Sequence, residues 1–408
     1  MSARRVVATG FGAVTPSGIG ADALWDAVSH GRSAIRRLEG VDVDGLPVRI
    51  GGQVRGFATT LGPALARRLS PVLQWAVAAA DEALGQAGGL PAAPHRVHVI
   101  AATGSGPVDA MQAATRALDA RGPRAVPLTL AIHGAPDAAA ALISQRHGIT
   151  GAASAVSATC ASGAVALGEG LRRIRHGYVD AVVVVGLEDC LGPVNLSSNA
   201  NLRALATGHD DAPETASRPF DRARRGFVMA QGAAAIVLES ADGARSRGAT
   251  ALAEIAGFGA SSDAHHPTAP LPDGAGAAAA IRDALADAHV DSGAVDHVNA
   301  HGTGTPAGDA AELAALAAAL GDRARAIPVT ATKSSTGHLL GAAGVVEAII
   351  AARTIRDGVL PPTLNLDDPE PGWRLVGSRT PSRLDTVLST SFGFGGHNGA
   401  LLIARADG

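Results

Sequence analysis

Short hydrophobic runs alternate along the chain with longer amphipathic or alanine-rich segments. Several short runs are continuously apolar, which is typical of strands buried on both faces. The longer segments repeat apolar residues at helical spacing. The pattern predicts strands at residues 5–9, 97–102, 154–159, 181–186, 233–239, 253–257, 295–300, 328–332, 388–390 and 401–404. It predicts helices at residues 21–30, 71–87, 163–176, 275–288, 310–319 and 343–357. This interleaving indicates an α/β fold with parallel or mixed sheets.

No linker rich in proline and serine divides the chain, and no short repeat recurs at a fixed period. The most proline-rich and polar stretch covers residues 259–274. It lies near the expected junction of two halves, and we interpret it as an entrance loop.

Composition excludes several classes of protein. With 408 residues and 47% hydrophobic residues, the chain can bury a large core, which excludes disorder. Charged residues make up 17%, the net charge is −3 and aromatic residues are only 3%, so we expect no nucleic-acid partner. The two cysteines provide neither a disulfide framework nor the spacing of a metal site.

Two further features bear on location. The longest apolar run, residues 313–320, is far shorter than the roughly 20 residues needed to cross a bilayer. The residues before the first predicted strand lack the apolar stretch of an export signal. We therefore expect a cytoplasmic protein without membrane contact.

Cys160 stands where a predicted strand ends and an apolar helix begins, in the segment SATCASGA (residues 157–164). A thiol at a helix N-terminus feels the positive end of the helix dipole, which predicts a lowered pKa and a nucleophilic role. The alternative is a small buried hydrophobic residue, and that is our interpretation of Cys190.

Two histidines and the only lysine lie in loops that follow predicted strands. His301 is part of NAHGTGTP (residues 299–306), and Lys333 and His338 are part of TKSSTGHLLGAAG (residues 332–344). All the other 33 of the 34 basic residues are arginines. A lone histidine is more often structural, but two in such loops beside the single lysine favour a chemical site. A fourth segment, SFGFGG (residues 391–396), indicates by itself only a flexible turn.

Together these segments resemble the elongating β-ketoacyl-acyl carrier protein (ACP) synthases, condensing enzymes of the thiolase superfamily with a Cys-His-His triad. The resemblance extends from RRVVATGFGAVTP (residues 4–16) through SRPFD (217–221) and GFVM (226–229) to SFGFGG. It therefore covers nearly the whole chain and includes type II polyketide ketosynthases. Initiating synthases of the superfamily use Cys-His-Asn, whereas both histidines are present here.

The resemblance implies a thiolase-like fold of two pseudo-symmetric halves in α-β-α-β-α layers. Residues 1–250 form the half that carries Cys160. Residues 251–408 form the half with both histidines, Lys333 and the glycine-rich gating loop. The site then lies between the halves.

The resemblance also implies a mechanism. Cys160 takes an acyl group from an ACP thioester, and the backbone N–H groups of Cys160 and Phe394 form the oxyanion hole. His301 and His338 donate to the malonyl thioester and stabilise the enolate formed by decarboxylation. No metal or redox cofactor is needed, since the substrates are carried on the phosphopantetheine arm of ACP.

The supporting roles follow from the same resemblance. Lys333 is expected to lie buried near His338 and to pair with Glu347. Thr303 and Thr305 are expected to bind the phosphopantetheine arm, and the ring of Phe394 to shield the nucleophile until it is acylated.

The expected partners are an acidic ACP and a second subunit, giving a homodimer or a heterodimer with a chain-length factor. Basic side chains are expected to bind ACP. Arg67, Arg68 and Arg203 match docking positions of the family, while Arg121 and Arg124 align less securely. Each of them is otherwise a solvated surface arginine.

The sequence also departs from the family pattern. Ala230 and Gln231 replace Gly-Glu, and His397 replaces a threonine beside the gating loop. Asn199 stands where elongating fatty-acid synthases place a bulky apolar residue in the acyl tunnel. This favours a functionalised or unsaturated acyl chain, although an interface loop explains Asn199 equally well.

Three alternatives stay open. A non-catalytic chain-length factor requires the nucleophile to be missing, and Cys160 is present. A thiolase requires a second catalytic cysteine near the C-terminus. A purely binding role predicts that Cys160 does not react with electrophilic acyl analogues. The sequence does not distinguish a fatty-acid pathway from a polyketide pathway.

Overall fold

The computed structural model describes residues 4–406. The strands are β1 (Val6–Thr15), β2 (Gly18–Ile19), β3 (Ile35–Arg37), β4 (Ile50–Gly52), β5 (Val97–Ala102), β6 (Ala153–Val156), β7 (Ala181–Glu188), β8 (Gly232–Ser240), β9 (Ala253–Ser262), β10 (His297–Asn299), β11 (Val329–Thr330), β12 (Val359–Leu360), β13 (Thr380–Pro381), β14 (Thr386–Gly393) and β15 (His397–Ala404). The α-helices are α1 (Ala21–Ser29), α2 (Pro63–Ala66), α3 (Pro71–Gln86), α4 (Val108–Arg121), α5 (Leu130–His133), α6 (Ala138–His147), α7 (Ser162–Arg175), α8 (Pro193–Asn201), α9 (Ala241–Ser246), α10 (Ala275–Asp287), α11 (Pro306–Leu320), α12 (Lys333–Thr336) and α13 (Ala343–Asp357).

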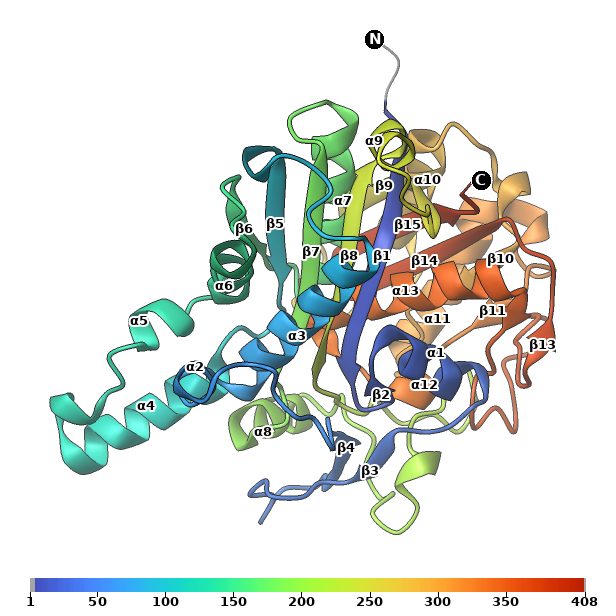
Figure 1. Cartoon of the computed structure of the whole chain (residues 1–408). Helices are drawn as coiled ribbons and strands as arrows, with labels where there is room; N and C mark the ends of the chain where they lie inside the picture. Colours follow the sequence, from blue (N-terminus) through green and yellow to red (C-terminus); the bar gives the residue numbers. More distant parts are fainter. Residues whose placement is uncertain (1–3, 407–408) are drawn as a thin grey trace.

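One large sheet runs through the described residues in the order β11-β10-β14-β15-β9-β1-β8-β7-β5-β6 (Figure 1). Read outward from its centre, the two sides repeat each other. β1, β8, β7, β5 and β6 correspond to β9, β15, β14, β10 and β11, with antiparallel pairs inside and parallel pairs outside. The two half-sheets meet where β1 pairs with β9 at Val7–Glu254 and Ala8–Ala253. The repeated order confirms the predicted pseudo-symmetric α/β architecture.

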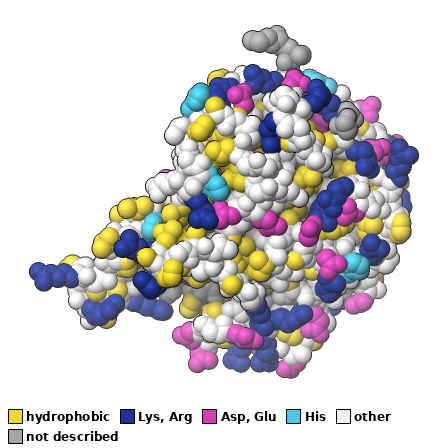
Figure 2. Space-filling model, viewed as in Figure 1, with side chains coloured by type: hydrophobic (Ala, Val, Ile, Leu, Met, Phe, Trp, Pro, Cys, Tyr) yellow, Lys and Arg dark blue, Asp and Glu magenta, His cyan; other side chains and the backbone are white. Residues whose placement is uncertain are grey.

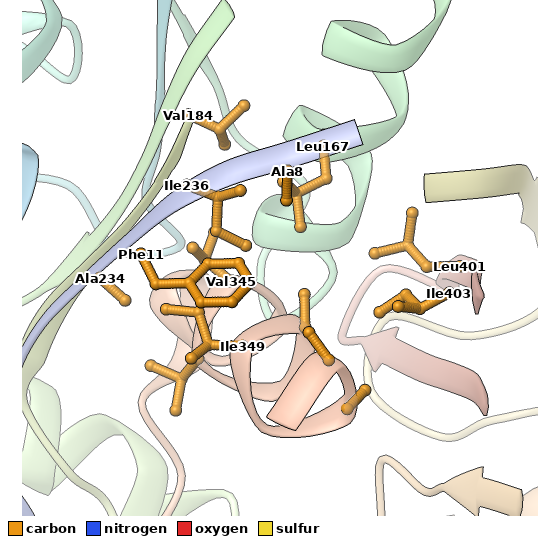
Figure 3. Packing of buried hydrophobic residues seen from close by; sticks show 14 of the residues in the cluster. Ala8, Phe11, Leu167, Val184, Ala234, Ile236, Val345, Ile349, Leu401 and Ile403 are labelled. Carbon is orange, nitrogen blue, oxygen red and sulfur yellow. The ribbon is translucent and has the colours of Figure 1, made fainter. Parts of the chain in front are cut away.

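Helices complete the layers. α3 and α6 pack on the first half-sheet, and α10 packs on the second half-sheet and against α11, while α7 and α13 contact each other between the half-sheets. Figure 3 shows this middle layer, where Leu167 of α7 and Val345 and Ile349 of α13 meet strand residues. The apolar faces predicted for residues 163–176 and 343–357 are thus buried on several sides. The boundary proposed at residue 250 stays a prediction.

The predicted strands agree best with the observed strands where both faces of the strand are buried. β5 has the predicted bounds, and β7, β8 and β14 extend the predicted runs by a few residues. The strand predicted at residues 154–159 is wrong at its end, because β6 stops at Val156 and the chain turns before Cys160. The helix predicted at residues 310–319 begins earlier, because Thr305 caps α11 by accepting from Gly308 N and Pro306 occupies the first turn.

An arm formed by α4 and α5 projects from the body (Figure 1) and had no counterpart in the sequence prediction. Ala114 is the single buried residue of α4, so this helix presents little apolar periodicity. The expected entrance loop is partly strand, since β9 continues to Ser262. None of the helices within residues 4–406 is long and apolar enough to cross a membrane.

Candidate active site

Cys160 lies in a tight turn between β6 and α7. Thr159, directly before it, has φ +49°, a left-handed conformation that non-glycine residues seldom adopt. The Ser162 hydroxyl donates to Thr159 O at 2.6 Å and accepts from Ala158 N at 2.8 Å. These bonds hold the turn, and Cys160 is only 7% exposed.

The expected lowering of the Cys160 pKa is wrong. The pKa of this thiol is raised to about 12, mainly by burial and to a smaller extent by the charge of Glu188. The Lys333 charge and the backbone N–H groups of Phe394 and Cys160 act in the opposite direction. Because desolvation outweighs them, the resting side chain is a protonated thiol.

His301 follows β10 and is held mainly through its backbone. Glu312 of α11 accepts from His301 N at 2.8 Å and from Gly302 N at 2.7 Å. The Thr390 hydroxyl also accepts from His301 N, at 3.0 Å. A buried carboxylate therefore fixes the loop, while Nδ1 of the His301 ring has no hydrogen-bond partner within the described chain.

His338 enters the same site from the loop after α12. Its backbone pairs with residues 228–230, donating to Val228 O at 2.7 Å and accepting from Ala230 N at 2.9 Å. Its ring lies 5.3 Å, centroid to centroid, from the ring of His301 and 5.4 Å from that of Phe227. Within residues 4–406, neither ring nitrogen of His338 has a hydrogen-bond partner.

Both imidazoles are kept neutral. Burial lowers the pKa of His301 and of His338 well below the usual value, and the positive charge of Lys333 lowers both further. A neutral imidazole donates one N–H and accepts at its other nitrogen. The pair can therefore donate to a substrate oxygen without carrying charge.

Lys333 is 1% exposed and contacts both the His301 loop and α13. Its Nζ donates to His301 O at 2.7 Å and forms an ion pair with Glu347 of α13. The contact expected between Lys333 and Glu347 is thus present. Burial raises the pKa of Glu347 to about 7, against the lowering effect of Lys333.

The loop at residues 393–396 closes over Cys160. The Thr159 hydroxyl donates to Phe394 O at 2.8 Å, and a Cβ placed on Gly393 would lie 2.1 Å from that hydroxyl oxygen. Glycine is therefore required for this close approach. On its other side the loop is bonded from Gly395 N to Pro267 O at 2.7 Å.

A pocket of about 370 Å³ joins these groups. Cys160, His301 and His338 line it together with Phe394. Thr303 and Thr305, which are expected to bind phosphopantetheine, line it as well. Residues 268–271 of the expected entrance loop line it as well, as does Arg203. The structure thus brings side chains more than a hundred positions apart into one cavity.

Other predicted residues lie elsewhere. Asn199 is half-buried on α8, donates to Asn195 O at 2.9 Å and does not line this pocket. Arg67 and Arg68 are exposed after α2, and Arg121 and Arg124 are exposed at the end of the arm. Figure 2 shows basic side chains gathered on that projection.

Sequence reasoning missed three buried carboxylates: Glu188, Asp309 and Glu312. Asp309 accepts from Gly304 N at 3.0 Å and from Phe220 N at 2.8 Å, which fixes the His301 loop beside Glu312. The available signal was a single acidic residue inside an apolar or alanine-rich run, because such residues are seldom buried unless paired. Within residues 4–406, no group of three or more His, Cys, Asp or Glu side chains is arranged to hold a metal ion.

Comparison with known families agrees with this geometry. Residues 3–244 match the family described as "Beta-ketoacyl synthase, N-terminal domain". Residues 252–367 match "Beta-ketoacyl synthase, C-terminal domain".

Individual proteins are similar over the whole chain. The chain is 40% identical over 420 residues to 3-oxoacyl-[acyl-carrier-protein] synthase 2 of Rhizobium meliloti (strain 1021), covering 99% of this chain and 100% of that protein. It is 39% identical to the Vibrio harveyi synthase of the same name, covering 99% of each. Solved structures include a type II PKS acyl-carrier protein in complex with its ketosynthase bound to the hexaketide (TM-score 0.92, 30% identity, 100% of both chains). The ishigamide ketosynthase/chain length factor is also similar (TM-score 0.90, 31% identity, 100% of both chains).

The matched ranges, the full-length identity and the repeated sheet order all lead to one assignment. The predicted resemblance is confirmed: this chain belongs to the β-ketoacyl synthase family.

Proposed function

We propose that the protein is a 3-oxoacyl-ACP synthase that lengthens an acyl chain by decarboxylative Claisen condensation. The observation that carries this is the meeting of Cys160, His301 and His338 in one pocket. The names of the full-length relatives support the same reaction.

In the first half-reaction Cys160 receives the acyl group. Its sulfur forms a bond to the acyl carbonyl carbon, and the bond from that carbon to the pantetheine sulfur breaks. Because the resting thiol is protonated, its proton has to leave as the new bond forms and passes to the departing pantetheine thiol.

In the second half-reaction a malonyl thioester loses CO₂. The electron pair of the broken carbon–carbon bond becomes an enolate, whose oxygen accepts N–H bonds from His301 and His338. The enolate carbon attacks the acyl-Cys160 carbonyl, and the resulting oxyanion accepts from the backbone N–H groups of Cys160 and Phe394. Expulsion of the Cys160 thiolate then releases a 3-oxoacyl-ACP longer by two carbons.

The phosphopantetheine group of the carrier protein is expected to enter the pocket past Thr303 and Thr305. Arg203 lines the pocket, and we assign it, with Arg67 and Arg68, to docking of an acidic ACP. The neighbouring structure that contains a carrier protein with its ketosynthase supports this partner.

A second condensing-enzyme chain is expected on the face formed by β6 and the arm. The outer edge of β6 is not paired within residues 4–406, whereas the corresponding edge of β11 is covered by residues 374–376. Exposed apolar side chains lie on the arm, namely Met111, Leu118, Leu128 and Ile132, and Val194 is exposed on α8, which contacts α4. Such an edge and patch are typical of a subunit interface. We leave the choice between a second copy and a chain-length factor to experiment.

The test is condensation with defined carriers. Wild-type protein, acyl-ACP and malonyl-ACP should give a 3-oxoacyl-ACP, detected by mass spectrometry of the carrier. Cys160→Ala should form neither acyl-enzyme nor product while keeping its fold by circular dichroism. Normal elongation by Cys160→Ala would contradict the assigned nucleophile, whereas a wild-type protein that forms neither acyl-enzyme nor product would favour the non-catalytic partner subunit. Comparing octanoyl, hexadecanoyl and polyene carriers in the same assay decides the acyl preference.

A further inference from the structure

Glu188 is a buried carboxylate that the reaction described above does not use. It ends β7, is 1% exposed and accepts four hydrogen bonds. Thr103 Oγ1 and Ser105 N donate to Oε1 at 3.1 Å each. Gly104 N and Gly341 N donate to Oε2 at 2.7 and 2.9 Å. Because all four partners are donors, the site fits an ionised carboxylate.

These bonds join segments that belong to different parts of the site. Residues 103–105 connect β5 to the arm, and Gly341 lies three residues after His338. The two segments touch so closely that a Cβ on Gly104 would lie 3.1 Å from Thr159 O and 3.2 Å from Gly341 N. Glu188 therefore holds residues 103–105 to the segment after His338. Through the packing of Gly104, this junction also lies against the turn that carries Cys160.

Backbone strain on both sides shows why such a restraint is needed. Leu340, between His338 and Gly341, has φ +44°, and Thr159 has φ +49°. Conformations of this kind are unfavourable and persist only where surrounding contacts enforce them. The Cys160 turn has its own bonds through Ser162 and Phe394. After His338, the Gly341 N–H is held by Glu188.

We propose that Glu188 is a positioning residue for decarboxylation: through Gly341 it fixes the loop that aims His338 at the malonyl thioester. This inference rests on the proposed function and adds a residue to it. Acylation of Cys160 depends on Glu188 less, because the carboxylate makes no hydrogen bond to the Cys160 turn itself. It is linked to that turn indirectly, through the packing of Gly104 and through Thr103, whose O accepts from the Ser162 hydroxyl at 3.2 Å.

The experiment measures the two half-reactions separately in Glu188→Gln, as acyl transfer to Cys160 and as CO₂ release from malonyl-ACP. The amide places an N–H₂ group against backbone donors, so the His338 loop shifts. We expect decarboxylation to fall on the order of ten- to hundredfold, since small displacements of reacting groups cost rate on this scale, and acylation to fall far less. Glu188→Asp keeps the charge but is too short to reach both loops, and should show the same selective loss.

A second measurement separates this role from mere stability. The Glu188 charge raises the pKa of Cys160. The pH profile of Cys160 alkylation should therefore move to lower pH in Glu188→Gln and stay in place in Glu188→Asp. Asp189→Asn is the matched control, because Asp189 is adjacent and forms no side-chain hydrogen bond or ion pair within residues 4–406. It should leave both half-reactions at wild-type rates.

Equal loss of both half-reactions in Glu188→Gln, or loss of neither, would overturn the proposal. If Glu188→Gln fails to fold, Gly104→Ala tests the same junction by inserting a methyl group between Glu188, Thr159 and Gly341. It should also impair decarboxylation, and unaltered decarboxylation would count against the proposal. A wild-type protein that acylates but never condenses would instead contradict the proposed function.

Discussion

At the scale of single residues, Cys160 combines a buried thiol with a nearby buried cation. Since its pKa is about 12, alkylation by iodoacetamide should keep rising with pH through pH 10. Lys333→Met removes a charge that lowers this pKa, so alkylation should be slower at every pH below 10. Rates measured by mass spectrometry check both expectations. A plateau near pH 7 would show instead that the thiolate forms easily.

The two histidines should affect one half-reaction. His301→Ala and His338→Ala each remove an N–H donor to the enolate, so CO₂ release from malonyl-ACP should fall by a factor on the order of a hundred or more. Acylation of Cys160 should persist in both variants, as measured by acyl-enzyme mass. If acylation fell as much as decarboxylation, the assignment of the two histidines to decarboxylation alone would be refuted.

Asp189 should make stability depend on pH. Burial, followed by the charges of Asp109 and Glu188, raises the pKa of Asp189 from 3.8 to about 7. Between these values the folded state binds more protons than the unfolded state, so the free energy of unfolding falls as pH rises. Asp189→Asn removes this loss and should stabilise the protein at pH 8 more than at pH 4.5, by up to a few kcal/mol at about 1.4 kcal/mol per pKa unit. Urea unfolding at both pH values measures the difference, and an equal effect at both would contradict the raised pKa.

At the scale of elements, packing between α7 and β9 leaves no room at Gly168. A Cβ there would lie 2.2 Å from the ring of Phe258. Gly168→Ala should therefore lower the free energy of unfolding by about 1–3 kcal/mol, the usual cost of overpacking. Gly85→Ala on α3 is the control, since nothing lies within 4 Å of its Cβ position, and it should raise that free energy by about 0.5–1 kcal/mol. Unfolding curves that rank the two variants the other way would show that α7 can shift.

Most elements of the middle and outer layers were predictable from the sequence because they carry strong apolar signals, but α6, which packs on the first half-sheet, was not predicted. β5 and α13 have the predicted bounds, since long apolar or amphipathic runs leave little freedom. α4 was missed because its single buried residue is Ala114 and its stability comes from surroundings that a local pattern does not encode. The pairing of β1 with β9 likewise could not be predicted from local sequence patterns, since it joins segments about 250 residues apart.

For the site, the sequence indicated which side chains meet but not their electrostatics. Cys160, His301 and His338 were identified through their motifs, and the structure places them in one pocket. The raised pKa of Cys160 was missed because it depends on desolvation by distant segments rather than on the local helix start. Glu188 was missed because its four donors come from two separate loops.

At the scale of the whole molecule, the face formed by β6 and the arm should govern association. Leu128 is 90% exposed and Ile132 is 60% exposed, which is costly for a lone chain in water. The wild-type protein should elute as a dimer in size-exclusion chromatography with light scattering, either alone or together with a chain-length factor. Leu128→Asp with Ile132→Asp should shift it to monomer, whereas Tyr178→Asp, at a position after α7 that is 72% exposed, should not. Monomeric wild-type protein that binds no second condensing-enzyme chain would refute the assigned face.

The near absence of lysine has a consequence for an enzyme that handles activated acyl groups. Its surface cations are arginines, because the single lysine, Lys333, is buried in an ion pair. A guanidinium stays protonated and has no free electron pair with which to attack a thioester, whereas a deprotonated amine does. Acyl groups that approach the pocket therefore meet no side-chain amine that could intercept them. Cys160 therefore competes with no surface lysine for the incoming acyl group.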